Sequence, residues 1–556
     1  MIHRSKLEAA IAENDPVAMS VTVEQQRKLL LTEKRMGRNK TGIRWRLWPI
    51  TRLLVIYGLI RFIIVSYTTV PAAIQVSQES LEEPLIRTKL ETPTTTSVNT
   101  TSTIMNTLRT MSLSASHLAP RYHVVFSTGC NTAQDWQSYV FFYHANKSGQ
   151  EGDVTRIASG CTSPKAKRAL IQFHSRTIKP LSPRFHLHVT PDYASTVKPR
   201  VTYKFFNKPF GMKHWMEHVL GYTTTTTTTN TTTTTSSSNN ESNSTTGSGE
   251  IVANKHDDTI IILLDPDQII LRPFRQDYSD VPNMGWHGHG GKQYNVSTKV
   301  QHGSTLAQYY GFRSQWLTKV NLTHVLGPNR TDSPLYQMTK EHGDFYAAGP
   351  PYLATARDMY KIVLAWTDFV PRVHDNYPHL LGEMFAYCLA TVHVNLLPQI
   401  AVGLMVSDPL SGHEEGWFFL TNAEKSTKLT YDEIWQQQYP QDVLPFVLHY
   451  CQMYNIGPYY FWKHVLRSDF LSCQAPLLRE PSRDLLKYDY GERPGGGGRI
   501  NLSKMKFRLA AAWMLTALIA ALNEAVEHYK QQHCKFHAVS NMNKVYDFGA
   551  NIPVTG

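Results

Sequence analysis

The sequence predicts an α/β protein built around a largely parallel β-sheet, and three observations lead to this prediction. Short runs rich in β-branched and aromatic residues alternate with segments whose apolar residues recur at helical spacing. The run "TIIILLDPDQII" at 259–270 opens with an almost unbroken apolar stretch, as in a strand buried on both faces. With 556 residues and an apolar content of 42%, the chain is long enough to bury a sizeable core.

The predicted elements follow one another in strand–helix order. Strand-like runs stand at 122–128, 153–159 and 184–192, helical patterns at 135–149 and 211–221, and the apolar strand at 259–270 follows them. The helix at 135–149 has Asp135 near its start and Gly149 at its end, which are typical boundary residues. In a layered α/β fold, ligands bind at the carboxyl ends of strands, where Asp265 and Asp267 are expected to lie.

The first 120 residues predict a tail, a membrane anchor and a stem. Residues 1–52 form a basic tail that ends directly before the apolar run at 53–70. Positive charge before a run of nearly spanning length predicts a signal anchor with a cytoplasmic N-terminus and a lumenal remainder. Arg61 lies within the run and is costly in a bilayer, so a buried amphipathic helix is the alternative. Residues 71–120 are rich in Thr and Ser and predict a disordered stem.

The rest of the chain is expected to form one domain, at 121–535, followed by a tail at 536–556. A Thr-, Ser- and Asn-rich run at 222–256 interrupts this domain and predicts a disordered surface insertion, which costs little closure entropy. The apolar stretch at 507–526 is unbroken only from Leu509 to Leu522. That length is short for a membrane span and predicts a packed core helix.

Charge and cysteine content narrow the class of protein. The net charge is +12, but much of the excess precedes the run at 53–70, so we expect no nucleic-acid partner. The six cysteines are too few for a disulfide scaffold, and none has the CxxC spacing of a zinc site. In an oxidising lumen, Cys130 with Cys161 and Cys451 with Cys473 are candidate pairs. Asn-x-Ser/Thr acceptors, which favour a lumenal location, occur at Asn99, Asn146, Asn230, Asn240, Asn243, Asn295, Asn321, Asn329 and Asn501.

The Asp265-Pro266-Asp267 turn suits a hard divalent cation, because carboxylate oxygens are preferred ligands of Mn²⁺ and Mg²⁺. In nucleotide-sugar transferases such an Asp-x-Asp element holds the metal that neutralises the departing diphosphate. A solvated turn is one alternative, since Asp and Pro are common turn residues. A phosphohydrolase is another, with Asp265 as the nucleophile that forms an aspartyl phosphate and Asp267 as the acid.

Several long blocks resemble one enzyme family. They include "YHVVFSTGCNTAQDWQSYVFFY", "GDVTRIASGC", "HVTPD", "NKPFGMKHWMEH", "IIILLDPDQIILRPF", "GPPYLATARDMYKIVLAW", "GEMFAYCLA", "VLHYCQMY" and "CQAPLLREP". Together they resemble the hydroxyproline O-arabinosyltransferases of plants and algae. The peptidyl serine α-galactosyltransferases share several blocks, whereas "VVFSTGC", "DWQSYVFFY" and "VTRIASGC" are more similar to the arabinosyltransferases. The resemblance covers about 120–530, apart from the Thr-rich insertion.

The resemblance implies a GT-A-like fold, with a Rossmann-like nucleotide-binding half and an acceptor-binding half. It implies transfer of a sugar, with retained anomeric configuration, from a UDP-sugar to a hydroxyl of a secreted polypeptide. For an arabinosyltransferase, the donor is UDP-β-L-arabinofuranose and the acceptor is hydroxyproline. A serine α-galactosyltransferase is the alternative, and a non-catalytic lumenal binding module is the alternative of another class. The expected location is the Golgi or ER membrane, as a single-pass type II protein.

The resemblance also assigns roles at the metal. Asp265 and Asp267 correspond to the family's metal motif, and His449 in "VLHYC" is expected to supply a third ligand to Mn²⁺ or Mg²⁺. Lys463 in "YFWKHVL" is expected to offset the charge of the donor diphosphate.

Four further residues are candidates around the sugar. Glu383 in "GEMFAY" is expected to face the sugar, as the acidic group that a retaining transfer uses, and Asp344 in "HGDFYAAGPP" is the alternative. His214 and Trp215 in "MKHWMEH" are expected to line the donor pocket.

Overall fold

The computed structural model describes most of the predicted catalytic region. The described residues are 121–225, 250–282, 284–285, 298–420, 441–456, 459–466, 468–481, 485–487, 505–535, 545–547 and 552–554. The predicted tail, anchor and stem at 1–120 lie outside them, as does most of the Thr-rich insertion and of the C-terminal tail. Those assignments therefore stay predictions.

A seven-stranded mixed sheet organises the described residues, in the order β10-β8-β9-β6-β1-β2-β3. The strands are β1 (Tyr122–Gly129), β2 (Asp153–Ser159), β3 (Phe185–Thr190), β6 (Ile260–Leu264), β8 (Leu306–Tyr309), β9 (Ala348–Thr355) and β10 (Gln399–Ala401). Strands β6, β1, β2 and β3 are mutually parallel, as predicted, whereas β9 runs antiparallel to both β6 and β8. The α/β class is confirmed, with one antiparallel strand in the middle of the sheet.

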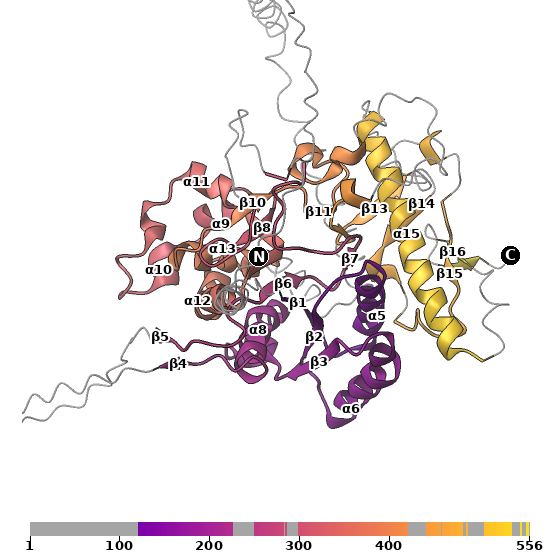
Figure 1. Cartoon of the computed structure of the whole chain (residues 1–556), viewed down its shortest axis with the longest axis horizontal. Helices are drawn as coiled ribbons and strands as arrows, with labels where there is room; N and C mark the ends of the chain where they lie inside the picture. The colour runs from indigo at the N-terminus through magenta and orange to yellow at the C-terminus, as the bar shows by residue number, and fades with distance from the viewer. Residues whose placement is uncertain are drawn as a thin grey trace, which may run out of the picture. The chain divides into compact units, whose positions relative to one another are not determined.

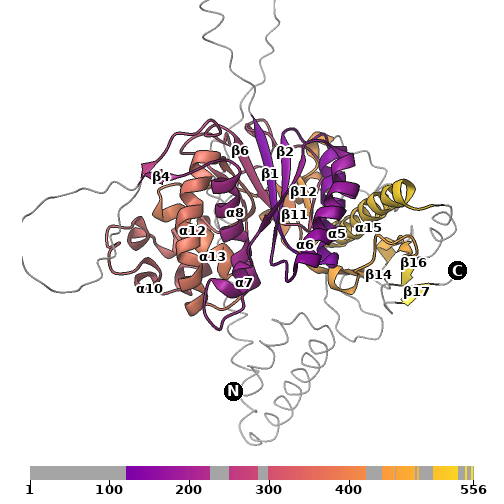
Figure 2. The ribbon, with the colours of Figure 1, turned by 90° about the horizontal axis from the view of Figure 1, so that it is seen from below.

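Helices cover both faces of this sheet (Figures 1 and 2). The main helices are α5 (Thr132–Lys147), α6 (Pro164–Phe173), α8 (Asn207–His218), α12 (Ala356–Asn376), α13 (Gly382–His393) and α15 (Met505–His533). Figure 2 shows α8, α12 and α13 on one side of the strands and α5, α6 and α15 on the other. The predicted helices at 135–149 and 211–221 correspond to α5 and α8, each beginning a few residues earlier than expected.

The unbroken apolar run of β6 follows from burial on both faces. Ile260, Ile262 and Leu264 belong to the core under α5 and α15, whereas Ile261 and Leu263 belong to the core under α8, α12 and α13. Successive side chains of a strand point to opposite faces, so a strand between two helical layers needs apolar residues at every position.

Helix α15 is a core helix, as the sequence predicts. Among the described residues it alone has the length and apolar composition of a membrane span, and 89% of its most apolar window is buried inside the protein. It packs along α5, where the hydroxyl of Tyr139 lies 2.8 Å from Nδ1 of His528.

Two small β-structures stand beside the main sheet and carry parts of the chain that are distant in sequence. A three-stranded sheet has the order β11-β12-β7, formed by Met405–Val406, Val447–His449 and Gln268–Ile270. In it β12 runs antiparallel to β7, with His449 opposite Gln268. A hairpin of β13 (Met453–Ile456) and β14 (Tyr459–Trp462) follows β12 and ends directly before Lys463. The expected strand at 259–270 is thus divided, and its second part belongs to another sheet.

The Thr-rich insertion leaves and re-enters the fold at one place. Strands β4 (Thr224–Thr225) and β5 (Glu250–Ile251) pair antiparallel at its two ends. Three further short strands, β15 (Leu477–Leu478), β16 (Val545–Asp547) and β17 (Ile552–Val554), form a separate sheet.

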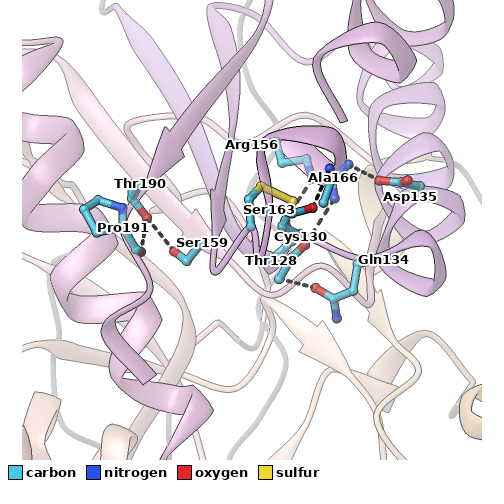
Figure 3. Close-up of a disulfide and its surroundings, with 12 residues drawn as sticks. Thr128, Cys130, Gln134, Asp135, Arg156, Ser159, Ser163, Ala166, Thr190 and Pro191 are labelled. Atoms are coloured by element: carbon cyan, nitrogen blue, oxygen red, sulfur yellow. Dashed lines mark hydrogen bonds and ion pairs between the residues drawn. A yellow bond between two sulfur atoms is a disulfide. The ribbon is translucent and has the colours of Figure 1, made fainter. Parts of the chain in front are cut away.

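One predicted disulfide is confirmed and the other is wrong. Cys130 and Cys161 are bonded and join the loops that follow β1 and β2 (Figure 3). Cys473 bonds to Cys534 rather than to Cys451, because the end of α15 brings Cys534 to a Cα–Cα distance of 5.6 Å from Cys473. Cys451 follows β12 directly and is not disulfide-bonded.

The same end of the sheet is also fixed by a buried cation. Arg156 on β2 is fully buried, and its Nε donates to Oγ1 of Thr128 at 2.8 Å. A terminal nitrogen of the same guanidinium donates to Asp135, in the first turn of α5, at 2.8 Å (Figure 3). These contacts tie the carboxyl ends of β1 and β2 to the start of α5.

Candidate metal centre

Two aspartates and a histidine meet where β6 ends. Asp265 and Asp267 form the turn between β6 and β7, and His449 is the last residue of β12. One potential ligand atom from each of the three residues lies within 4.8 Å of the others. Asp267 and His449 are buried, whereas Asp265 is partly exposed. The pairing of β12 with β7 accounts for this proximity, since it places His449 opposite Gln268 and so beside the turn at 265–267.

The side chain of Gln268 holds the turn in place. Its Oε1 accepts from the backbone N–H of Asp265 at 2.9 Å, and its Nε2 donates to the carbonyl of Pro350 on β9 at 3.1 Å. The backbone N–H of Tyr450 donates to the carbonyl of Asp267 at 3.0 Å. Gln268 is fully buried, so this arrangement satisfies polar groups that would otherwise be costly.

Asp267 is paired with two cationic or potentially cationic groups. Nε2 of His449 lies 3.3 Å from its Oδ1, and the ammonium of Lys463 contacts its Oδ2. Burial by itself would raise the pKa of Asp267, but Lys463 and His449 hold it well below its usual value. On the other side of the imidazole, the hydroxyl of Tyr310 lies 3.4 Å from Nδ1 of His449.

Asp265 is paired with a lysine from helix α8. Lys208, in the first turn of α8, places its Nζ 2.7 Å from Oδ1 of Asp265 and 3.2 Å from Oε2 of Glu383. Glu383 stands in the first turn of α13. The side chains of Lys208 and Glu383 are 12% and 2% exposed, so this three-residue ion cluster is largely removed from solvent.

The pKa values of Glu383 and Lys208 are both raised, for different reasons. Burial, together with the charge of Asp265, raises the pKa of Glu383 to about 7 against the opposing effect of Lys208. Burial would lower the pKa of Lys208, but the two carboxylates raise it above its ordinary value. Lys208 therefore keeps its positive charge, which two carboxylates share. Glu383 gains or loses its proton near neutral pH. Oε1 of Glu383 is buried and has no hydrogen-bond partner among the described residues.

These residues fit a divalent cation. Two carboxylates and an imidazole whose ligand atoms lie close together suit Mn²⁺, and the two carboxylates alone suit Mg²⁺. Asp265, Asp267 and His449 would hold the ion. Bound there, a cation would supply positive charge to a diphosphate leaving group.

The structure thus brings together five of the residues expected from the sequence: Asp265, Asp267, His449, Lys463 and Glu383. The others lie elsewhere. Asp344, in α11 (Lys340–Phe345), accepts a hydrogen bond from the backbone of Ser314 at 2.7 Å, next to α9 (Gln315–Thr318). Asp344 thus holds the backbone at the start of α9.

The expected donor-pocket residues on α8 make their contacts with other parts of the fold. Trp215 has no exposed surface and packs edge-on against His123, with ring centroids 4.7 Å apart. The indole has no exposed face in this structure, and its place in a donor pocket stays a prediction. Nδ1 of His214 lies 2.8 Å from Nε2 of His188 on β3, and its ring stacks on His218.

Three residues of the centre were missed from sequence: Lys208, Gln268 and Tyr310. For Lys208 a signal existed, since it begins the helix that precedes the metal-motif strand, and such helices start at the carboxyl edge of the sheet. Tyr310 carries no local signal, because its place depends on how β8 and β9 pair.

Acidic, imidazole and ammonium groups at the carboxyl edge of an α/β sheet define the class of this site: a candidate centre for a divalent cation and a phosphate-bearing ligand. Comparison with known proteins points to one group of enzymes. No family model matches the chain. It is 32% identical over 99 residues to a peptidyl serine alpha-galactosyltransferase of Arabidopsis thaliana, covering 18% of this chain and 11% of that protein. It is 23% identical over 368 residues to a protein of the same name from Chlamydomonas reinhardtii, covering 65% of this chain and 38% of that protein.

The chain therefore spans well under half the length of these two relatives. Similar solved structures include the galactosyltransferase LgtC in complex with donor and acceptor sugar analogs, at 10% identity and a TM-score of 0.27, over 59% of this chain and 87% of that chain. The glycosyltransferase GlyE of Streptococcus pneumoniae has 9% identity and a TM-score of 0.26, over 60% of this chain and 55% of that chain. Both sequence relatives bear the name of the serine galactosyltransferases and not of the hydroxyproline arabinosyltransferases.

Proposed function

We propose that the protein is a glycosyltransferase that moves a sugar from a UDP-sugar to a hydroxyl group of a secreted polypeptide. One observation carries the proposal: Asp265, Asp267 and His449 converge at the carboxyl edge of the sheet, with one lysine on each aspartate. That edge is where open α/β sheets bind ligands. The names of the two sequence relatives support the same reaction class.

Different residues around the centre are suited to different parts of the donor substrate. Lys463 is suited to a diphosphate oxygen, since its ammonium stands beside Asp267 with 19% of its side chain exposed. Glu383 is suited to the sugar, because its Oε1 is buried and has no partner among the described residues. A retaining transfer needs a group of this kind on the face opposite the leaving group, either as nucleophile or as a stabiliser of positive charge at the anomeric carbon.

Two candidate specificities remain within this reaction class. Transfer of L-arabinofuranose to hydroxyproline is favoured by the sequence blocks "VVFSTGC", "DWQSYVFFY" and "VTRIASGC". Transfer of galactose to serine is favoured by the names of the two relatives. In both cases we place the protein in the Golgi or ER membrane, anchored by residues 53–70, with the catalytic domain in the lumen.

A donor and acceptor screen tests the proposal. Purified protein with Mn²⁺ is incubated with UDP-arabinofuranose, UDP-galactose or UDP-xylose and with peptides that contain hydroxyproline or serine. Sugar transfer from one donor, lost on removal of the cation with a chelator, is the expected result. A protein that neither transfers nor hydrolyses any of the three donors would contradict the proposal. A phosphoaspartate trapped at Asp265 would instead identify a phosphohydrolase.

A further inference from the structure

Each aspartate of the metal motif is paired with its own partly buried lysine, and the two lysines come from different parts of the fold. Lys208, from α8, contacts Oδ1 of Asp265 at 2.7 Å. Lys463, from the segment after β14, contacts Oδ2 of Asp267. The side chains of these lysines are 12% and 19% exposed, so both ion pairs lie in a weakly screened environment.

These ion pairs affect any cation that the centre binds. A cation held by Asp265, Asp267 and His449 would share both carboxylates with the ammonium groups. Repulsion between positive charges is strong where little water intervenes. The three ligands alone would therefore bind a divalent ion more tightly than they do beside two ammonium groups.

The two lysines differ in whether a second anion is at hand when the aspartate is given up. Lys208 already has a second carboxylate, Oε2 of Glu383, at 3.2 Å, and can remain paired if it moves away from Asp265. Among the described residues, Lys463 forms an ion pair with Asp267 alone, so it would need a new anion on leaving that aspartate. A diphosphate bridging to the cation would provide one, since a lysine ammonium binds phosphate oxygens well.

We infer that Lys208 and Lys463 compete with the divalent cation for Asp265 and Asp267, and that a nucleoside diphosphate relieves this competition. This inference rests on the proposed function, because it takes the phosphate ligand from there. It means that cation and diphosphate bind cooperatively and that the cation alone binds weakly. By linkage, each ligand strengthens the other by the same factor.

Mn²⁺ titrations of the purified full-length protein, followed by the electron paramagnetic resonance signal of the free ion, test the inference. We expect UDP to strengthen Mn²⁺ binding by about tenfold or more in the wild-type protein. Lys463→Met and Lys208→Met should each bind Mn²⁺ alone about tenfold more tightly, because one competing charge is gone. In Lys463→Met the strengthening by UDP should also fall, since the phosphate loses its ammonium partner.

Matched variants separate competition from a general effect of losing a lysine. Lys213 lies on the same helix as Lys208, and Lys213→Met removes only a partly exposed pair with Glu217, so this variant should titrate as the wild type. Lys463→Arg and Lys208→Arg keep the charge and should keep weak binding of the cation alone. Melting curves identify the variants that fold as the wild type does.

Two results would overturn the inference. One is Mn²⁺ binding by folded methionine variants that is no tighter than in the wild type. The other, which needs no variant, is a wild-type Mn²⁺ affinity that is the same with and without UDP. Neither titration requires sugar transfer. A protein that shows the coupling and transfers no sugar would contradict the proposed function alone, and an active transferase without coupling would contradict this inference alone.

Discussion

Oε2 of Glu383 lies 3.2 Å from Nζ of Lys208, and this contact joins the first turn of α13 to the first turn of α8. Both helices thus begin beside the end of β6. The contact holds a buried carboxylate next to the metal motif while leaving its other oxygen without a hydrogen-bond partner among the described residues. The hydrogen-bonding capacity of this oxygen is therefore unused, beside the residues that would hold the cation.

Glu383→Gln should lower kcat for sugar transfer by about 100-fold or more, because a neutral amide stabilises positive charge at the anomeric carbon poorly. The loss should be larger in kcat than in the donor KM, since the variant keeps the direct metal and diphosphate ligands and only deprives Lys208 of its second carboxylate. Steady-state kinetics with the donor found in the screen measure both. Glu341→Gln, at an exposed position of α11, serves as the control. A kcat within about threefold of the wild type would exclude Glu383 from the chemistry.

Asp267→Asn should weaken UDP binding in the presence of Mn²⁺ by about 100-fold or more, because it removes a metal ligand and leaves Lys463 without its carboxylate. Isothermal titration with and without Mn²⁺ gives the affinity. Asp258→Asn is the matched control, since that side chain is 84% exposed just before β6. Unchanged UDP affinity in Asp267→Asn would contradict the metal assignment.

A buried carboxyl outside the centre makes the stability depend on pH. Glu415 accepts hydrogen bonds from Oγ of Ser407 at 2.6 Å and from the backbone of Asp408 at 2.9 Å. Burial nevertheless raises its pKa to about 7, from an ordinary value of 4.5. The folded state therefore holds this proton more tightly than the unfolded state. The stability that Glu415 contributes is complete below pH 4.5 and is lost as the pH rises through 7.

Glu415→Gln should remove this dependence. Between pH 4.5 and pH 7 the free energy of unfolding of the variant should rise relative to the wild type by about 1–3 kcal/mol. Urea denaturation at several pH values and constant ionic strength measures the difference. If the two proteins differ by the same amount at every pH, Glu415 does not change its protonation in this range.

The disulfide pairing is open to direct mapping. Peptides from alkylated, unreduced protein should contain Cys130 linked to Cys161 and Cys473 linked to Cys534, with Cys388 and Cys451 alkylated. Replacing both Cys473 and Cys534 by Ser should lower the free energy of unfolding by about 2–4 kcal/mol, because the bond closes a long loop in the unfolded chain. Cys451→Ser is the control and should leave both linked peptides in place. A peptide joining Cys451 to Cys473 would restore the pairing expected from sequence.

The centre was predictable to the extent that its residues stand at element ends. The apolar run before Asp265 marks a buried strand, and polar residues after such a strand are expected at the ligand-binding edge. His449, Lys463 and Glu383 could be assigned only through resemblance to a family, since nothing in their local sequence distinguishes them from structural residues. Lys208 was missed because a lysine in a first helical turn is more often solvated than buried. The role of Trp215 could not be decided from sequence, because an aromatic residue on a helix packs into a core as readily as it lines a pocket.

By itself, the sequence determined the features that arise from neighbours along the chain. These are the alternation of strands and helices, the turn after β6 and the packed helix near the C-terminus. The tertiary structure alone decided the partners of Asp265 and Asp267, the exposure of Trp215, the raised pKa of Glu383 and the partner of Cys473. Each depends on strand register and helix packing between segments far apart in sequence, and burial then sets the electrostatics of the groups that meet there.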